Sequence, residues 1–177
     1  MKTVSLNGNW KYRVGYGDFS DICVPFSRLP VGRSECVKTF DLPELSENVF
    51  LKFEGITYYA KVELNGVDLG EMLPYSEYEF DVTGIVRQKG NTLTVVLEDI
   101  NRAFGPSDGW ANFGGIIRDV YLEMRGEHYI ENVFFKTSLC EDYTGADICV
   151  DISARCPSDA NFLIELVRDE TPVLSYT

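Results

Sequence analysis

The chain has 177 residues, a formal net charge of -12 and an isoelectric point near 4.5, with 45% hydrophobic and 13% aromatic residues. That hydrophobic content supports a buried core and excludes a disordered chain. The charge disfavours nucleic acid and anionic membranes as partners, because the lysines and arginines form no basic patch to offset it. No apolar run approaches the ~20 residues that a membrane-spanning helix needs.

The N-terminal run MKTVSLNGNW lacks the apolar core of a secretion signal, so we expect a cytoplasmic protein. The five cysteines form no C-x-x-C pair, which predicts reduced and mostly buried thiols: Cys23, Cys36, Cys140, Cys149 and Cys156. The single histidine, His128, excludes a His-rich zinc site and gives little support to a Ser-His-Asp arrangement. The sequence therefore predicts no metal, no cofactor and no catalytic residue.

Alternation of apolar and polar residues recurs along the chain and predicts antiparallel strands with one buried face. The runs at 48–53, 93–97 and 120–124 each place three apolar residues on one face. At 60–72 we expect a hairpin, because Asn65-Gly66 suits a type I′ turn with two positive φ angles. Helix is limited to one turn near 81–90, with Asp81 or Thr83 as its cap. An all-β sandwich or jelly roll follows.

After Met124, the mixed polarity of RGEHYIENV predicts a link between two units. Three further strand patterns follow in NVFFKTSL, ADICVDISA and NFLIELVRD, about half of the roughly seven strands of an immunoglobulin-like sandwich. We expect one domain over 1–126 and a truncated sandwich over 127–177. The open half of that sandwich predicts a homo-oligomer or a missing partner segment.

The run GPSDGWANFGGIIRDVYLEM, residues 105–124, places Asp108, Trp110 and Asn112 in a glycine-rich loop. As a structural corner, Trp110 would close the end of the sandwich, while Gly114 and Gly115 supply positive φ angles. As a sugar site, the indole would stack on a pyranose while the acid and the amide bind hydroxyl groups. Composition alone favours the corner.

Several motifs together indicate a family. They are LNGNW at 6–10, VP at 24–25, FEGITYYAKVELNGVDLGE at 53–71, EFDVTGIVRQKGNTLTVVLED at 79–99 and DGWANFGGIIRDVYL at 108–122. In this order and spacing the chain resembles the N-terminal region of family-2 glycoside hydrolases, the β-galactosidase, β-glucuronidase and β-mannosidase group. The resemblance implies a galactose-binding-like jelly roll over 1–126, followed by a partial immunoglobulin-like β-sandwich.

In that family the catalytic unit is a (β/α)₈ barrel after these two domains. A barrel needs ~250 residues, and the Asn-Glu pair that holds the family's acid/base is absent from this sequence. The resemblance thus implies a catalytically silent fragment of a retaining β-glycosidase, whose partners are the missing barrel and a carbohydrate. Two alternatives stay open: a free-standing carbohydrate-binding module and an interaction scaffold.

The resemblance also implies roles for single residues. Asp108, Trp110 and Asn112 would line the rim of the barrel's substrate pocket. Asn65 and Gly66 would form the hairpin turn, and Gly114 and Gly115 belong to the structural motif. Arg118 would make a bidentate pair with a carboxylate at the domain junction.

Overall fold

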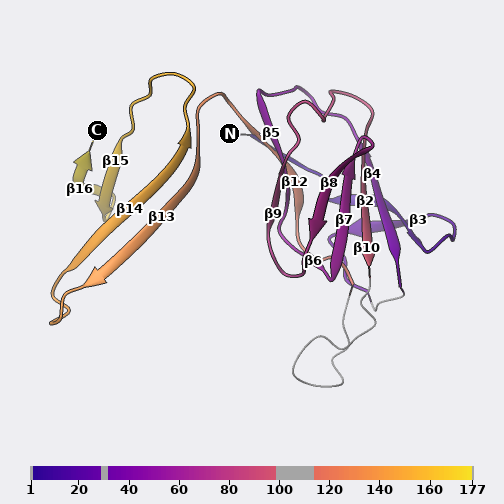
Figure 1. Ribbon diagram of the computed structural model, residues 1–177, viewed down its shortest axis with the longest axis horizontal. Helices are drawn as coiled ribbons and strands as arrows, with labels where there is room; N and C mark the ends of the chain where they lie inside the picture. Colours follow the sequence, from indigo (N-terminus) through magenta and orange to yellow (C-terminus); the bar gives the residue numbers. More distant parts are fainter. Residues whose placement is uncertain (1, 29–31, 99–113, 177) are drawn as a thin grey trace. The chain divides into compact units, whose positions relative to one another are not determined.

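The structure is a computed structural model that describes residues 2–28, 32–98 and 114–176 (Figure 1). The chain divides into two compact units, Met1–Gly126 and Glu127–Thr177. Every regular element in the described ranges is a β-strand, so the predicted all-β class is confirmed. No helix in those ranges could cross a membrane.

Two antiparallel sheets build the first unit and form its facing layers in Figure 1. One sheet has four strands in the order β1 (Lys2–Ser5), β12 (Val120–Arg125), β5 (Asn48–Phe53) and β9 (Tyr78–Asp81). The other has six, in the order β3 (Ser20–Val24), β2 (Gly8–Val14), β4 (Ser34–Phe40), β10 (Asn91–Glu98), β7 (Tyr59–Leu64) and β8 (Val67–Met72). A separate two-stranded sheet pairs β11 (Gly115–Ile116) with β6 (Ile56–Thr57).

Alternate residues of both sheets form one apolar core. Leu51 and Leu122 face each other across β5 and β12, and Val62 and Val95 do so across β7 and β10. All four are at most 1% exposed, and each such burial contributes about 1.5–3 kcal/mol. The period-two pattern therefore predicted the inward face of these strands correctly.

The turn between β7 and β8 has the geometry that its dipeptide requires. Asn65 has a φ of 54° and Gly66 a φ of 84°, between the paired residues Leu64 and Val67. A second turn follows β9, where the Thr83 amide donates to the Asp81 carboxylate at 2.9 Å. Glycine and short polar side chains fix both turns locally.

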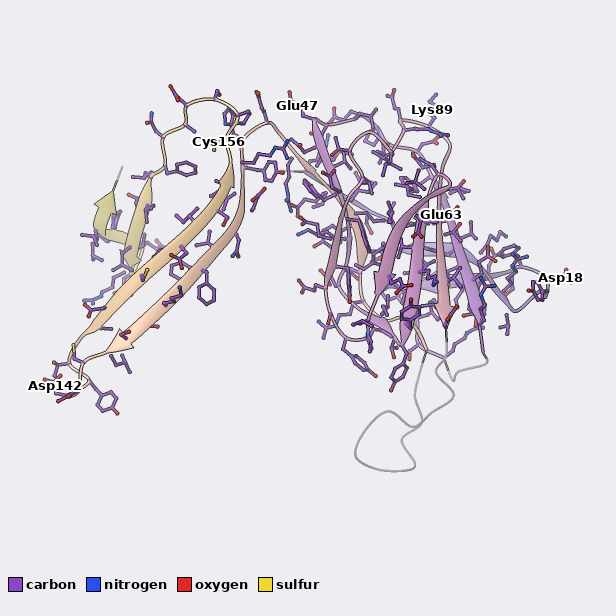
Figure 2. The ribbon with its side chains drawn as sticks, viewed as in Figure 1. Asp18, Glu47, Glu63, Lys89, Asp142 and Cys156 are labelled. Carbon is purple, nitrogen blue, oxygen red and sulfur yellow. The ribbon has the colours of Figure 1, made fainter. Side chains whose placement is uncertain are left out.

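The second unit consists of two hairpins. They are β13 (Tyr129–Leu139) with β14 (Ala146–Arg155), and β15 (Ile164–Arg168) with β16 (Thr171–Tyr176). In Figure 2, Asp142 marks the turn of the first hairpin and Cys156 lies just beyond its other end. Whether this unit is immunoglobulin-like stays a prediction.

Two expectations were wrong. The expected link over 125–133 is shorter, because β12 runs to Arg125 and β13 begins at Tyr129. The first residues of β13, YIENV, include polar residues and do not alternate regularly between apolar and polar, so the strand could not be recognised there from the sequence. The cysteines are free but not mostly buried: only Cys36 is, and burial, with the neighbouring Glu35 carboxylate, raises the pKa of its thiol to about 12.

Candidate functional site

The segment that carries Asp108, Trp110 and Asn112 connects β10 to β11, and these three residues lie outside the described residues. Both ends of the segment, however, are described, at Glu98 and at Gly114. We call the residues that hold these ends the loop frame: 26–28, 56–59, 98 and 114–116. Its geometry determines where the segment enters and leaves the sandwich.

The downstream end is held by backbone hydrogen bonds to residues far away in the sequence. Arg28 donates to the Gly114 carbonyl at 2.9 Å, and Gly114 donates back to Arg28 at 2.7 Å. Phe26 donates to the Ile116 carbonyl at 2.7 Å. β11 also pairs with β6. The backbone at 114–116 is therefore hydrogen-bonded to residues 26–28 and to β6, and these two neighbours fix its path.

Position 115 in the loop frame has no room for a side chain, so it requires glycine. A Cβ atom there would lie 2.3 Å from the Phe26 carbonyl oxygen, closer than real atoms approach. At Gly114 the nearest atom to a Cβ would be the Thr57 carbonyl oxygen at 3.7 Å, an ordinary contact. The two glycines, for both of which a positive φ was predicted, therefore differ. Gly115 has a φ of 156° and allows the backbone of 26–28 to approach, whereas Gly114 has no positive φ, so that prediction was wrong for Gly114.

The upstream end is acidic and holds a protonated phenol. Glu98 lies opposite Tyr59 in the register of β10 and β7. The hydrogen bond of Tyr59 to Glu71, followed by burial and the nearby carboxylates of Glu98 and Asp68, raises the pKa of Tyr59 to about 12. At neutral pH this phenol is therefore a hydrogen-bond donor and no base, and the same bond lowers the pKa of Glu71.

Thr57 is a functional candidate that sequence analysis missed. It is 2% exposed, and its hydroxyl oxygen is buried without a hydrogen-bond partner among the described residues. It pairs with Gly115, so this unsatisfied hydroxyl lies beside the downstream end of the segment. An unpaired buried polar group costs ~1–3 kcal/mol, which marks Thr57 as a group able to accept a partner.

Aromatic rings lie next to Thr57. Tyr58 packs edge-on against Tyr75 at 6.1 Å between ring centroids, and Tyr75 is 66% exposed. Tyr75 has a φ of 60° and its amide donates to the Ile56 carbonyl at 3.0 Å, which fixes this uncommon conformation. An exposed tyrosine ring thus packs against Tyr58 of the loop frame.

The remaining motif residues are structural or stay predictions. Arg118 is exposed, and its side-chain stem covers Gly55, where a Cβ would lie 3.3 Å from the Arg118 Cδ atom. No carboxylate among the described residues pairs with it, so the expected bidentate pair stays a prediction. In the part of the chain that the structure describes, no group of His, Cys, Asp and Glu residues could hold a metal ion.

The two-layer antiparallel sandwich of the first unit is the architecture of a galactose-binding-like domain. Solved structures share it: a β-glycosidase from Bacteroides vulgatus superposes with a TM-score of 0.75 at 21% identity, over 89% of this chain and 25% of that one. A β-glucuronidase from an uncultured Clostridium species gives a TM-score of 0.73 at 21% identity, over 88% and 34%. At this identity the likeness establishes the fold.

Sequence relationships establish the family. Residues 34–105 match the family described as glycosyl hydrolase 2 galactose-binding domain-like. The β-galactosidase of Clostridium acetobutylicum is 32% identical over 132 residues, which cover 70% of this chain and 14% of the relative. That of Thermoanaerobacter pseudethanolicus is 28% identical over 137 residues, or 73% and 18%. The first unit therefore belongs to the galactose-binding-like domains of glycosyl hydrolase family 2, and the chain spans less than a fifth of these two relatives.

Proposed function

We propose that Met1–Gly126 is a non-catalytic domain of a retaining β-glycosidase and that its segment 99–113 contributes to the rim of the substrate pocket. The enzyme would cleave a terminal β-linked sugar with two carboxylates supplied by a barrel domain. Asp108 and Asn112 would bind sugar hydroxyls at the rim, and Trp110 would cover a face of the ring.

The observation that carries this proposal is the loop frame. Both ends of the segment are fixed by the sheets, and the downstream end is held by Arg28, Phe26 and β6 at hydrogen-bond distance. Binding groups on a loop are effective when a rigid scaffold positions the loop. Thr57, whose hydroxyl has no hydrogen-bond partner among the described residues, and the exposed ring of Tyr75 add a polar and an aromatic group within the loop frame and in contact with it.

A chimera tests the rim. Residues 1–126 would replace the matching region of the Clostridium acetobutylicum β-galactosidase, with activity measured on a nitrophenyl β-galactoside. We expect Asp108→Ala to lower kcat/KM about 100-fold, because the acid would bind the sugar in the transition state. Glu63→Ala, an exposed acid on β7, is the matched control and should leave kcat/KM unchanged.

Two outcomes contradict the proposal. One is an Asp108→Ala chimera as active as the Glu63→Ala chimera at equal thermal stability. The other is hydrolysis of the nitrophenyl glycoside by the 177-residue chain itself, which would place catalytic groups within this chain.

A second candidate function, assembly with another copy, is supported by the second unit. One face of the hairpin β13–β14 carries exposed apolar side chains, among them Phe135 at 65% and Ile148 at 50% exposure. Such a face stabilises a protein complex when another surface covers it.

A further inference from the structure

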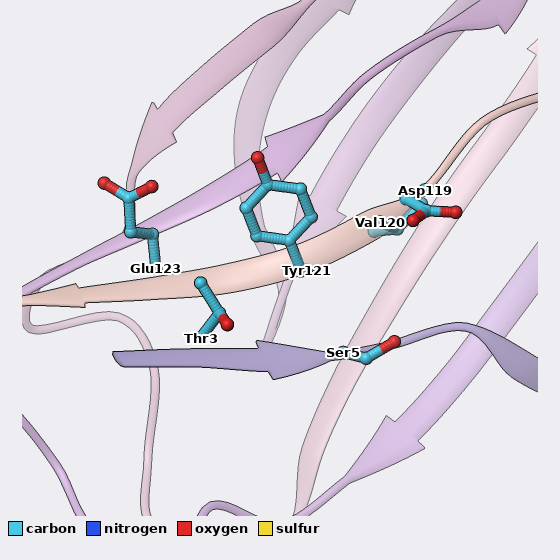
Figure 3. Close-up of a pocket in the computed structure, with 6 residues that line it drawn as sticks. All are labelled: Thr3, Ser5, Asp119, Val120, Tyr121 and Glu123. Carbon is cyan, nitrogen blue, oxygen red and sulfur yellow. The ribbon is translucent and has the colours of Figure 1, made fainter. Parts of the chain in front are cut away.

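The outer face of the four-stranded sheet carries a tyrosine between two hollows. Figure 3 shows Tyr121 rising from β12, with Asp119 and Glu123 to either side and Thr3 and Ser5 on the neighbouring strand β1. These residues line a hollow of about 300 Å³. A second hollow of about 250 Å³ lies on the other side of Tyr121, toward β5 and β9.

Strand register places these side chains together. Ser5 lies opposite Tyr121 and Thr3 opposite Glu123 in the antiparallel pair of β1 and β12. On the other side, Lys52 of β5 lies opposite Tyr121. Because neighbouring residues of a strand point to opposite faces, this polar set is on the outer face while Val120 and Leu122 enter the core. The positions are therefore fixed by the sheet.

The carboxylates of this face are held in place. The Glu123 side chain is only 9% exposed, and it pairs with Lys52 at 3.5 Å and with the Arg125 guanidinium. One Asp119 oxygen accepts a hydrogen bond from the side-chain amide of Asn7 at 2.9 Å, and its second oxygen has no donor within the described ranges, so it can accept from a ligand. Both groups are oriented acceptors next to the hollow.

The hydroxyl groups supply donors. Among the described residues the hydroxyls of Thr3 and Tyr121 have no hydrogen-bond partner, and that of Ser5 only accepts one from the Asn7 backbone amide at 3.2 Å. Burial and the nearby carboxylates raise the pKa of Tyr121 against the lowering effect of Lys52, so its phenol is protonated at neutral pH. The face thus combines free donors, fixed acceptors and one half-buried aromatic ring.

This combination fits one class of ligand. Sugar hydroxyls both donate and accept hydrogen bonds, and the C–H face of a sugar ring packs against an aromatic ring. The surrounding acids, which include Glu54 and Glu77 at the second hollow, disfavour uronates and phosphates. We propose that the face around Tyr121 binds an uncharged saccharide chain, with one ring against Tyr121 and its neighbours in the two hollows.

This site is independent of the proposed rim, because residues on and beside strands β1, β12, β5 and β9 line its two hollows, and none of these lining residues belongs to the segment 99–113. Amide NMR titration of the ¹⁵N-labelled 177-residue chain with cellotetraose and with β-1,4-galactotetraose tests it, and trigalacturonate serves as the anionic comparison. We expect at least one neutral probe to shift the amides of residues 3–5 and 119–123 at up to about 10 mM.

Variants assign the binding to Tyr121. Tyr121→Ala should raise the Kd at least about tenfold, and Tyr121→Phe, which keeps the ring, should stay within about threefold. Thr3→Arg, a change on an exposed edge strand, should block the hollow without affecting the core. Tyr16→Ala removes a ring that is 97% exposed elsewhere and should change nothing.

Several results would overturn the proposal. They are no shift with either neutral probe, shifts as strong with trigalacturonate, or unchanged affinity in folded Tyr121→Ala or Thr3→Arg. Loss of binding in Trp110→Ala with full binding in Tyr121→Ala would assign the sugar to the rim, so this inference and the proposed function fail separately.

Discussion

Asn91 is a buried polar residue of the first unit whose side-chain amide makes four hydrogen bonds. Its side chain is fully buried, and its Oδ1 atom accepts from the Asn65 amide at 3.0 Å and the Arg87 backbone at 2.8 Å. Its Nδ2 atom donates to the carbonyls of Arg87 at 2.6 Å and Phe40 at 3.3 Å. One amide therefore joins the start of β10 to two turns and to β4.

We expect Asn91→Ala to lower the free energy of unfolding by about 2–4 kcal/mol, because it leaves several buried backbone and side-chain groups unpaired. Urea unfolding followed by tryptophan fluorescence measures this loss. The matched control is Asn48→Ala, which removes one hydrogen bond to the Gly126 carbonyl at the surface and should cost below about 1 kcal/mol. Equal losses in the two variants would show that the buried amide is no more important than an exposed one.

At the scale of the element, four charged residues join the outer faces of β5, β9 and β12. The Glu79 carboxylate pairs with Lys52 at 2.9 Å and with Arg125 at 2.6 Å, and Glu123 pairs with both cations. The Arg125 guanidinium also lies 4.1 Å from the centroid of the Phe50 ring. Cross-strand ion pairs of this kind stabilise the pairing of neighbouring strands, in addition to the contribution of the apolar core.

This network makes stability depend on pH in the acid range. Burial alone would raise the pKa of Glu79, but hydrogen bonds from Lys52 and Arg125 outweigh burial, so the pKa is lowered from 4.5. A lowered folded-state pKa stabilises the protein above pH 4.5, and this contribution is lost as the pH falls through the folded-state pKa. We expect Glu79→Gln to cost roughly 1 kcal/mol at pH 7, a discounted value because the side chain is 38% exposed.

Urea unfolding at a series of pH values from 7 down to 3 measures this effect. The difference between the parent chain and Glu79→Gln should shrink below pH 4.5. Glu63→Gln is the control, because Glu63 is exposed on β7 and forms no ion pair among the described residues, so its curve should follow the parent curve. A constant difference across the pH range would contradict the role of the Glu79 charge.

Local sequence patterns predicted the strands that bury one face. In β10, Leu93, Val95 and Leu97 occupy alternate positions, and the structure buries all three, while the intervening Thr94 and Val96 are half-buried. These local patterns could not predict which strands pair over long distances in the sequence. Lys2, for example, lies opposite Met124 only after the whole unit has folded. The start of β13 was missed because both of its faces are exposed, so no burial imposes alternation on its sequence.

The candidate site was predictable only in part for a similar reason. Glycine and aromatic residues mark the segment 99–113 locally, whereas the frame combines residues near 28, 57 and 114 through backbone hydrogen bonds. Thr57 gave no signal, because a threonine in a strand is common, and the lack of a hydrogen-bond partner in the described part of the chain appears only in the folded structure. Sequence thus indicates where a site lies more readily than what holds it.

At the scale of the whole molecule, the second unit exposes what a folded domain normally buries. Across β13 and β14, Phe135 lies opposite Val150 and Val133 opposite Ile152, on a face without charged residues. The other face is polar, where Lys136 pairs with Asp151 at 2.9 Å. Val150 and Ile152 are half-buried beside Phe162 and Ile164, but Phe135 and Val133 remain exposed. A hairpin whose apolar face is only partly covered is marginally stable in water, so a further covering surface would stabilise it.

If a second copy of the chain packs against the apolar face of β13 and β14, a charged side chain introduced on that face should abolish association. We expect the parent chain to show a concentration-dependent increase in mass in sedimentation velocity, and Phe135→Glu to stay monomeric, because a buried carboxylate is costly to desolvate. Phe134→Glu is the matched control: the neighbouring ring is 52% exposed, on the polar face next to Lys136, so association should persist. A parent chain that is monomeric at every concentration, or equal effects of the two variants, would exclude assembly through this face.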